Sequence, residues 1–385
     1  TDDERERVKN ILVEYNDIFA RHRFDIRFND KFTVKLTPAE GGTAYSQSLP
    51  TPVHLKDDIT VELAMLHKYG IITTLTHSKY ASPIFAQRKP NGRLRLLVDL
   101  RKINSLITDD YVNNNYPVST LSDAAQHMAG KRLFCKLDCS QAYHCLQMAD
   151  KRSVEMLAFN FASRTFAYRR LAQGLSRSLS AFSSFMREYL DPVVKADQCA
   201  QYVDDIGIAA NDSKQLILNL RAVFECIRKA GLKLTMSKCH FGATQVDFLG
   251  RTITAEGITP QKAKVTKFLS TVKFPKSKKA LQRYIGFLNY YRNYIPRLSE
   301  RLTPFFKLLK TDEKITLTPE LMEKFKELNQ ALQRCTDLSL KQPKANRQYI
   351  LMTDASFSAA GYAIMIEDDP EQKITSTRKT YAPIA

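Results

Sequence analysis

Tryptophan is absent from this sequence of 385 residues, so aromatic packing must rest on its 21 Phe and 17 Tyr. No apolar run approaches the roughly 20 residues that a membrane-spanning helix needs, so we expect no membrane partner. The charged N-terminal residues 1–7 lack the apolar core of a secretory signal peptide. The seven cysteines include no CxxC pair, which disfavours a disulfide framework or a zinc site. It favours reduced thiols in an intracellular protein.

Positive charge is what the sequence has in excess. Its formal net charge of +18 suits a polyanionic partner, nucleic acid before an acidic membrane surface. Between Thr271 and Lys310, ten Lys or Arg residues stand against a single acidic residue, Glu300, and tyrosines are interleaved among them. This segment is either a solvated basic helix packed by its tyrosines or a helical surface that binds the phosphate backbone of a duplex. We favour the second interpretation.

Two adjacent carboxylates, Asp204 and Asp205, interrupt the apolar run of residues 201–208. Such a run predicts two short buried strands joined by a tight turn that carries the acidic pair. Neighbouring carboxylates in apolar surroundings are unfavourable unless a cation neutralises them, and Mg²⁺ is a hard cation that carboxylates bind. The alternative is a solvated turn without a catalytic role.

A third carboxylate, Asp138, ends an apolar segment that starts at Leu133. Residues 133–148 predict a strand that delivers this carboxylate, followed by a turn into a helix. Three carboxylates on neighbouring strands can hold two metal ions about 3.5–4 Å apart, an arrangement suited to in-line phosphoryl displacement.

Residues 82–104 predict a hairpin, because apolar strands flank a Pro-Asn-Gly turn at residues 90–92. Four basic residues lie on or beside that turn: Arg88, Lys89, Arg93 and Arg95. They make either a solvated basic hairpin or a clamp for a polyphosphate, whose oxygens guanidinium groups bind in pairs.

Hydrophobic periodicity places the remaining elements, which together indicate an α+β protein. Helices are expected at residues 2–20, 57–69, 213–230 and in a serine-rich segment that ends near residue 190; Gly70 and Gly231 end two of them. Strands are expected at residues 156–161, 165–168, 232–234, 246–250, 252–253, 349–356 and 360–366.

These motifs, in this order and spacing, resemble the reverse transcriptase of LTR retroelements, most closely the gypsy-type retrotransposon Pol polyprotein, from about residue 45 onward. The motifs that carry the resemblance are Leu137-Asp138, Ala142-Tyr143-His144, Gln173-Gly174-Leu175, Tyr202-Val203-Asp204-Asp205, Phe248-Leu249-Gly250, Tyr290-Tyr291-Arg292 and Thr353-Asp354-Ala355-Ser356. Three residues depart from it. Leu179 and Ser180 stand where the family usually has a proline-containing helix start, and Ala142 replaces a frequent glycine.

The resemblance implies a right-hand polymerase with fingers, palm and thumb, followed by the first strands of a truncated RNase H-like domain. The implied domains are an N-terminal helix and connector (1–50), fingers and palm (51–255), thumb and helical connection (256–340) and the start of RNase H (341–385). The family's RNase H site needs four acidic residues. Only Asp354 is present here, so no RNase H activity is expected.

The resemblance also implies roles for individual residues. Asp138, Asp204 and Asp205 would be catalytic and would bind two Mg²⁺, or Mn²⁺. The nucleotide would contact Lys89, Arg95, Ala142, Tyr143, Gln173 and Gly174. The primer and template would contact Tyr202, Phe248, Leu249, Gly250, Lys278, Lys279, Arg283 and Arg292. The Tyr143 ring would exclude a 2′-hydroxyl, unless it serves only in core packing.

The expected activity is therefore RNA- and DNA-directed DNA synthesis from dNTPs on a primer. The expected partners are an RNA template, a DNA primer and the rest of a Pol polyprotein with its protease, RNase H and integrase, in cytoplasmic virus-like particles. Two alternatives remain open. One is a catalytically silent nucleic-acid-binding subunit of the same fold, and the other is a palm-type polymerase that makes RNA.

Overall fold

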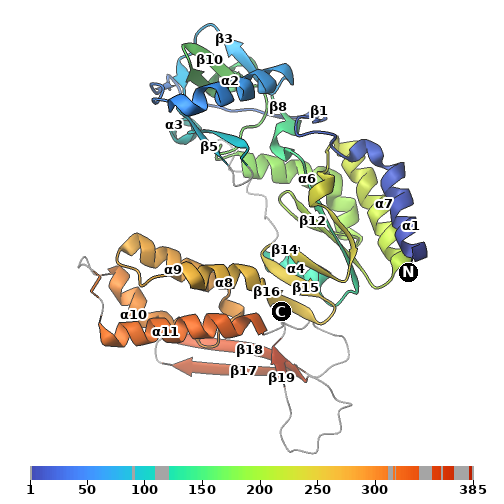
Figure 1. Ribbon diagram of the computed structural model, residues 1–385, viewed down its shortest axis with the longest axis vertical. Helices are drawn as coiled ribbons and strands as arrows, with labels where there is room; N and C mark the ends of the chain where they lie inside the picture. Colours follow the sequence, from blue (N-terminus) through green and yellow to red (C-terminus); the bar gives the residue numbers. More distant parts are fainter. Residues whose placement is uncertain are drawn as a thin grey trace, which may run out of the picture. The chain divides into compact units, whose positions relative to one another are not determined.

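The computed structural model describes residues 2–88, 92–108, 121–310, 315–316, 318–337, 349–356, 359–367 and 381–383 (Figure 1). The chain divides into two compact units. Unit 1 comprises Thr1–Ser119, Lys136–Ile208 and Ile217–Phe241; unit 2 comprises Thr120–Cys135, Ala209–Leu216 and Gly242–Ala385. Within the described ranges, no helix combines the length and apolarity needed to cross a bilayer. None of the seven cysteines, all within the described ranges, forms a disulfide bond.

In unit 1, helix α1 lies along helix α7 (Figure 1). The Tyr15 ring packs against Phe224 with 5.4 Å between centroids, and its hydroxyl donates to Glu225 at 2.7 Å. The predicted stripe on α7 is buried at Leu220 and Val223, as an amphipathic helix requires. α1 is shorter than the predicted helix. The bounds are α1 Asp2–Glu14, η1 Asn16–Ile18 and α7 Ser213–Ala230.

The acidic residues belong to a four-stranded sheet with the strand order β11-β12-β7-β13. β11 and β12 form the predicted hairpin, in which Tyr202 pairs with Asp205 across a two-residue turn. β7 ends in Asp138 as predicted and neighbours β12. The bounds are β7 Leu133–Asp138, β11 Ala200–Tyr202, β12 Asp205–Ala210, β13 His240–Ala243, α6 Ser178–Lys195 and η4 Met236–Lys238.

The helix predicted after Asp138 is wrong. Gln141 adopts a left-handed φ of 48°, and one 3₁₀ turn then leads directly into strand β8. β8 buries Leu146 and Met148 while Gln147 between them is only half-buried, which is the two-residue period of a strand. β8 pairs in parallel with β1. The bounds are η3 Ala142–Cys145, β8 Leu146–Met148 and β1 Asn29–Val34.

A second sheet of unit 1 has the order β3-β10-β9 and confirms the strands predicted near residues 158 and 165. Helix α2 packs against β3 and against β6 of the basic hairpin. In that hairpin Ile84 pairs with Val98 and Arg88 with Leu94, while turn residues 89–91 lie outside the described residues. The bounds are α2 Val53–Lys68, β2 Ala44–Tyr45, β3 Ile72–Leu75, β4 Tyr80–Ala81, β5 Ile84–Arg88, β6 Leu94–Val98, α3 Arg101–Leu106, α5 Lys151–Met156, β9 Ala158–Phe161 and β10 Arg164–Tyr168.

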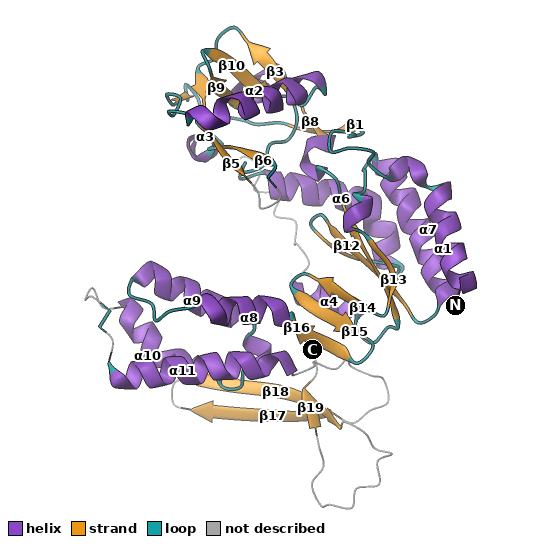
Figure 2. Cartoon of the chain, in the orientation of Figure 1, coloured by secondary structure: helices purple, strands orange, loops and turns teal. Residues whose placement is uncertain are grey.

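Unit 2 contains the sheet β14-β15-β16, a group of helices and the strands β17–β19 (Figure 2). Its helices share a core in which Leu281, Leu288 and Phe305 are fully buried, so the basic segment has an apolar packing face as well as its charged residues. The bounds are α4 Leu121–Met128, β14 Gln245–Phe248, β15 Arg251–Thr254, β16 Gly257–Pro260, α8 Lys262–Thr271, α9 Lys278–Tyr290, η5 Arg292–Tyr294, α10 Leu298–Lys310, α11 Pro319–Arg334, η6 Cys335–Asp337, β17 Tyr349–Ser356, β18 Ala359–Glu367 and β19 Tyr381–Pro383.

Residues 232–234 form no regular strand, contrary to the prediction. Leu234 makes isolated bridges to Phe19 and to Cys139 instead. Because these partners come from distant parts of the chain, the segment joins the N-terminal connector to the end of β7.

His144 is buried in unit 1, where its Nδ1 lies 3.2 Å from the Leu171 carbonyl oxygen and its ring stacks on Tyr168. Burial lowers the pKa of His144 from 6.5 to about 4. Between these two pKa values the unfolded chain binds more protons than the folded one. His144 therefore costs no stability above the unfolded pKa and destabilises the fold as pH falls toward the folded value.

We predict that acidification from pH 7 to 4.5 lowers the unfolding free energy of the wild type by about 2 kcal/mol more than that of His144→Gln. Urea unfolding at the two pH values measures this difference. His77→Gln, which removes an exposed histidine, is the control and should behave like the wild type. Equal pH dependence in all three proteins would show that His144 is not held neutral.

Candidate active site

The turn between β11 and β12 presents Asp204 to solvent and holds Asp205 half-buried at the start of β12. Val203, the first residue of this turn, has a φ of 56°, which is strained for a β-branched side chain. The Gln201 side-chain amide donates to the Val203 carbonyl at 2.8 Å and secures the turn. Such strain persists only where the surrounding structure enforces it.

Strand β7 brings Asp138 to the same region. Lys136 and Asp138 are two residues apart on a strand, so their side chains share one face of the sheet. The Lys136 Nζ lies 3.9 Å from an Asp205 carboxylate oxygen. The face of β7 that carries Asp138 is therefore also the face that meets Asp205.

A second lysine approaches from a distant part of the sequence. The Lys238 Nζ, at the end of η4, donates to an Asp138 carboxylate oxygen at 3.0 Å. Each lysine thus contacts one carboxylate of the group.

The Asp205 carboxylate is affected by burial, by the other two carboxylates and by both lysines. Burial raises the pKa of Asp205, and the carboxylates of Asp204 and Asp138 raise it further, against the opposing effect of Lys136 and Lys238. This interaction brings together the three carboxylates that the sequence predicted to converge.

The donor set fits a hard divalent cation. Carboxylate oxygens are the ligands Mg²⁺ takes, and Mg²⁺ typically uses one or two of them together with substrate phosphates. No group of three His, Cys, Asp or Glu side chains in the described ranges forms a ready-made metal cage.

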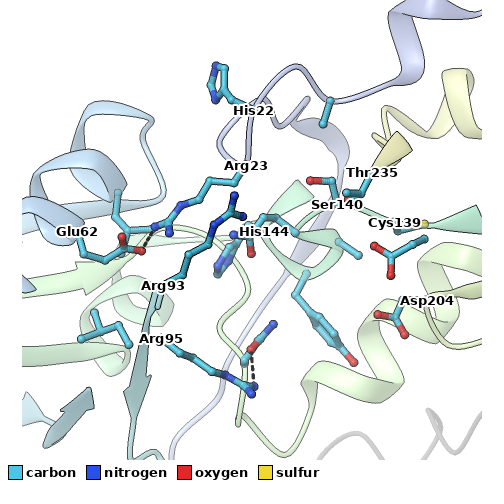
Figure 3. A pocket seen from close by; sticks show the side chains of 18 of the residues that line it. His22, Arg23, Glu62, Arg93, Arg95, Cys139, Ser140, His144, Asp204 and Thr235 are labelled. Carbon is cyan, nitrogen blue, oxygen red and sulfur yellow. Dashed lines mark hydrogen bonds and ion pairs between the residues drawn. The ribbon is translucent and has the colours of Figure 1, made fainter. Parts of the chain in front are cut away.

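Beside the carboxylates lies a cavity of about 610 Å³, and every residue that lines it belongs to unit 1 (Figure 3). Asp138 and Asp204 lie on its wall, as do Ala142, Tyr143 and Gln173. The inner strand of the basic hairpin, β6, supplies Arg95. Its Nη2 donates to the Gln173 side-chain oxygen at 3.4 Å. Cationic and acidic groups thus face one space.

The loop that carries Gln173 and Gly174 is held by Asn104 of helix α3. The Asn104 side-chain amide donates to the Gly174 carbonyl at 3.0 Å, and its oxygen accepts from the Ser176 N–H at 2.8 Å. Gly174 has a φ of 91°, which a side chain would strain. The loop is thereby positioned at the rim of the cavity.

Tyr143 is half-buried on η3 and packs against Phe182 of α6, with 4.9 Å between ring centroids. Burial raises the pKa of Tyr143, and the Asp204 carboxylate adds to the shift, so the phenol stays protonated. The ring both packs against the core and lines the cavity. These two roles do not exclude each other.

The residues predicted to contact primer and template fall in both units. Tyr202 is half-buried on β11 in unit 1. In unit 2, Phe248 is fully buried, while Leu249 and Gly250 form the next turn, where the Tyr290 hydroxyl donates to the Leu249 carbonyl. A Cβ on Gly250 would lie 2.6 Å from that hydroxyl oxygen, so the turn requires glycine.

The remaining predicted residues of unit 2 lie in or beside the basic helices. Lys279 and Arg283 are exposed on α9, Lys278 is half-buried at its start and Arg292 is exposed on η5. Asp354 belongs to β17, but its side chain is outside what the structure describes. Lys89 lies outside the described residues.

Sequence reasoning missed several side chains at this site. Lys136 carried a usable signal, since it precedes Asp138 by one strand period. The other side chains carried no such signal in the sequence, because each reaches the site only through the tertiary fold; these are Lys238, Asn104, Arg23 and Glu62.

Comparison with known proteins identifies the segment that holds these residues. The family model described as reverse transcriptase (RNA-dependent DNA polymerase) matches residues 87–253. This segment resembles a reverse transcriptase domain. Its match spans all three carboxylates, the cavity loop of Gln173 and most of the basic hairpin.

Relatives of this reverse transcriptase chain are polyproteins of transposons. It is 26% identical to the retrovirus-related Pol polyprotein from transposon 297 of Drosophila melanogaster, over 96% of this chain and 35% of that protein. It is 27% identical to that from transposon opus of the same species, over 100% of this chain and 40% of that protein. It is 28% identical to the transposon Tf2-3 polyprotein of Schizosaccharomyces pombe, over 89% of this chain and 25% of that protein. The chain thus spans at most two fifths of these relatives, and the expected resemblance to LTR-retroelement polyproteins is confirmed.

Solved structures of similar fold come from foamy virus. The protease–reverse transcriptase dRH in complex with double-stranded DNA superposes with a TM-score of 0.83 at 20% identity, covering 100% of this chain and 65% of that one. The protease–reverse transcriptase in complex with an RNA/DNA hybrid superposes with a TM-score of 0.79 at 20% identity, covering 100% of this chain and 50% of that one. The α+β polymerase fold expected from the sequence is confirmed. The RNase H identity of residues 341–385 and the four domain boundaries remain predictions.

We predict that Asp205→Asn stabilises the reverse transcriptase chain in the absence of divalent metal, raising the melting temperature by about 1–3 °C, because it removes a carboxylate from a crowded, half-buried group. Added Mg²⁺ should stabilise the wild type and close this gap. Thermal unfolding with chelator and with Mg²⁺ measures both effects. Asp191→Asn is the control, since the Asp191 side chain is also 33% exposed but lies in i,i+4 ion pairs on α6. A lower melting temperature of Asp205→Asn in chelator would contradict the assignment.

Proposed function

We propose that this chain is an RNA- and DNA-directed DNA polymerase that transfers a nucleotide from a dNTP to a primer 3′-hydroxyl. The observation that carries the proposal is the convergence of Asp138 with Asp204 and Asp205, from strands far apart in the sequence, beside a cavity with cationic walls. Acidic groups that bind metal and basic groups that bind phosphate are the two requirements of phosphoryl transfer.

The three aspartates would hold two Mg²⁺, which when bound supply charge stabilisation for the attacking and leaving oxygens. Basic side chains of the chain itself would neutralise the remaining charge of the triphosphate. Arg95 would bind triphosphate oxygens, and its contact with Gln173 orients the guanidinium toward the cavity. Lys89, on the same hairpin, would add a second cation. Ala142 and Gly174 would leave room for the nucleotide.

Primer and template would be bound through unit 2. Exposed Lys279 and Arg283, with Lys278 and Arg292, would contact the phosphate backbone, which gives affinity without base specificity. Tyr202 and the turn at Leu249 and Gly250 would lie along the primer. The foamy virus relatives were solved with double-stranded DNA and with an RNA/DNA hybrid, which supports nucleic acid as the partner.

The chain would act within a longer Pol polyprotein that also carries protease, RNase H and integrase and serves DNA integration. Its curated relatives are named as transposon polyproteins and are much longer. Cytoplasmic virus-like particles are the setting that we propose.

We predict that Asp204→Asn lowers Mg²⁺-dependent extension of oligo(dT) on poly(rA) by more than about 10²-fold, the scale of losing one charge-stabilising group. Extension with and without chelator measures the effect, and an unchanged melting curve shows that the fold persists. Asp191→Asn should extend normally. If the wild type binds primer–template but extends nothing, the chain is a silent binding subunit. Normal extension by Asp204→Asn would remove the pair from catalysis.

We also predict that Tyr143→Ala admits ribonucleotides, because a smaller side chain removes the clash with a 2′-hydroxyl. The ratio of kcat/KM for dNTP over rNTP should fall by at least about 10-fold, the effect of about 1.4 kcal/mol. Tyr143→Phe keeps the ring and should keep the ratio. An unaltered ratio in the alanine variant would assign Tyr143 to packing alone, and a wild type that prefers rNTPs would indicate an RNA-making enzyme.

A further inference from the structure

The N-terminal connector of unit 1 contributes a wall to the cavity beside the carboxylates. Ala20, Arg21, His22 and Arg23 line it, although no motif of the catalytic region lies near them in sequence. The segment is fixed there because the Ala20 N–H donates to the Leu234 carbonyl at 2.9 Å. Leu234 in turn bridges to Cys139, the residue after Asp138.

The cavity lining is cationic on balance. Five lining residues are Arg or Lys and three are Asp or Glu. Two of the five cations, Arg21 and Arg23, come from the connector. Without them the remaining cations would only match the acidic groups, so the connector supplies the surplus positive charge.

Arg23 is held rigidly. Its Nη2 pairs with Glu62 of helix α2, and its guanidinium lies over the Phe24 ring at 4.2 Å from the centroid (Figure 3). Its Nε is buried and has no hydrogen-bond partner within the described part of the chain. A buried donor without a partner is unfavourable, and the Arg23 guanidinium is therefore not fully satisfied by its contacts with the protein.

Arg21 is exposed beside it. Its backbone N–H donates to the Asp25 carboxylate at 2.9 Å, which fixes the backbone and leaves the long side chain at the cavity. Guanidinium groups bind phosphate oxygens in pairs, so two neighbouring arginines on a fixed backbone suit an anion with several phosphates.

We propose that Arg21 and Arg23 form an outer phosphate subsite of this cavity, which binds the polyphosphate of an incoming nucleoside triphosphate or the pyrophosphate that leaves. This assignment rests on the proposed function. The concave shape and the volume of about 610 Å³ suit a small molecule, whereas a nucleic-acid duplex needs an extended surface.

The direct test is calorimetric titration of the full chain with inorganic tripolyphosphate, in chelator and without nucleic acid. Arg21→Gln should raise the Kd by about 5–10-fold, the loss of one charge-assisted contact. It should also reduce the salt dependence of binding. Arg7→Gln is the control, because Arg7 is an exposed arginine of unit 1 on α1 that pairs with Asp3. It should leave the Kd unchanged.

Arg23→Gln leaves Glu62 without its partner and can destabilise the fold. The double variant Arg23→Gln/Glu62→Gln keeps the test sound, because it removes both charges of the pair. It should weaken tripolyphosphate binding while retaining the wild-type melting temperature within a few degrees.

Steady-state extension separates the two sources of the polyphosphate. A raised KM for dNTP at constant kcat assigns the subsite to the incoming nucleotide, and weaker inhibition by added pyrophosphate assigns it to the product. Equal tripolyphosphate Kd values for wild type, Arg21→Gln and Arg7→Gln would overturn the proposal. So would a loss confined to primer–template affinity, which would indicate a nucleic-acid surface. Failure of the polymerase assignment appears instead in the Asp204→Asn assay, which does not depend on this binding measurement.

Discussion

Repulsion among three carboxylates is the constraint around which unit 1 is arranged. One sheet carries three interacting carboxylates, those of Asp138, Asp204 and Asp205, and burial raises the pKa of Asp205. Two lysines lie beside these carboxylates. Lys136, on β7 with Asp138, contacts Asp205, and Lys238 of η4 contacts Asp138. Under the proposed function, Mg²⁺ would add to the positive charge that these lysines supply, and the substrate in the cavity would bring the phosphates that complete its coordination.

The acidic residues themselves were predictable from sequence, and the reason is local. A carboxylate that ends an apolar strand is visible without knowledge of the fold, and both Asp138 and the Asp204–Asp205 pair have this signature. Their partners were less accessible. Lys136 could be inferred from the two-residue period of a strand, whereas Lys238 lies 100 residues from Asp138 and only the tertiary structure brings them together.

The same distinction explains which elements were predicted. Helix α7 agrees because its apolar stripe repeats at helical spacing and Gly231, with a φ of 71°, ends it. The helix predicted for residues 142–148 was wrong because Gln141 adopts a left-handed conformation, which ends a helix. Nothing in the sequence indicates this conformation, since glutamine rarely adopts it. Strand β13 was missed because it has only four residues and includes Gly242, although Phe241 packs against Phe19 and Phe224. Tertiary pairing, rather than local pattern, makes it a strand.

The strained turn places the two adjacent aspartates, Asp204 and Asp205, in different surroundings. Val203, with its φ of 56°, places Asp204 on the exposed side, where it lines the cavity. Asp205, one residue later, is half-buried against Lys136. A two-residue hairpin turn has a positive φ at its first central residue, so the conformation of Val203 belongs to the hairpin that carries the two carboxylates. Under the proposed function, Asp204 would meet a substrate from the cavity, while Asp205 would act from behind it through its charge. The tight turn therefore imposes on a β-branched residue a conformation that normally favours glycine, and the hairpin in turn fixes where the two carboxylates lie.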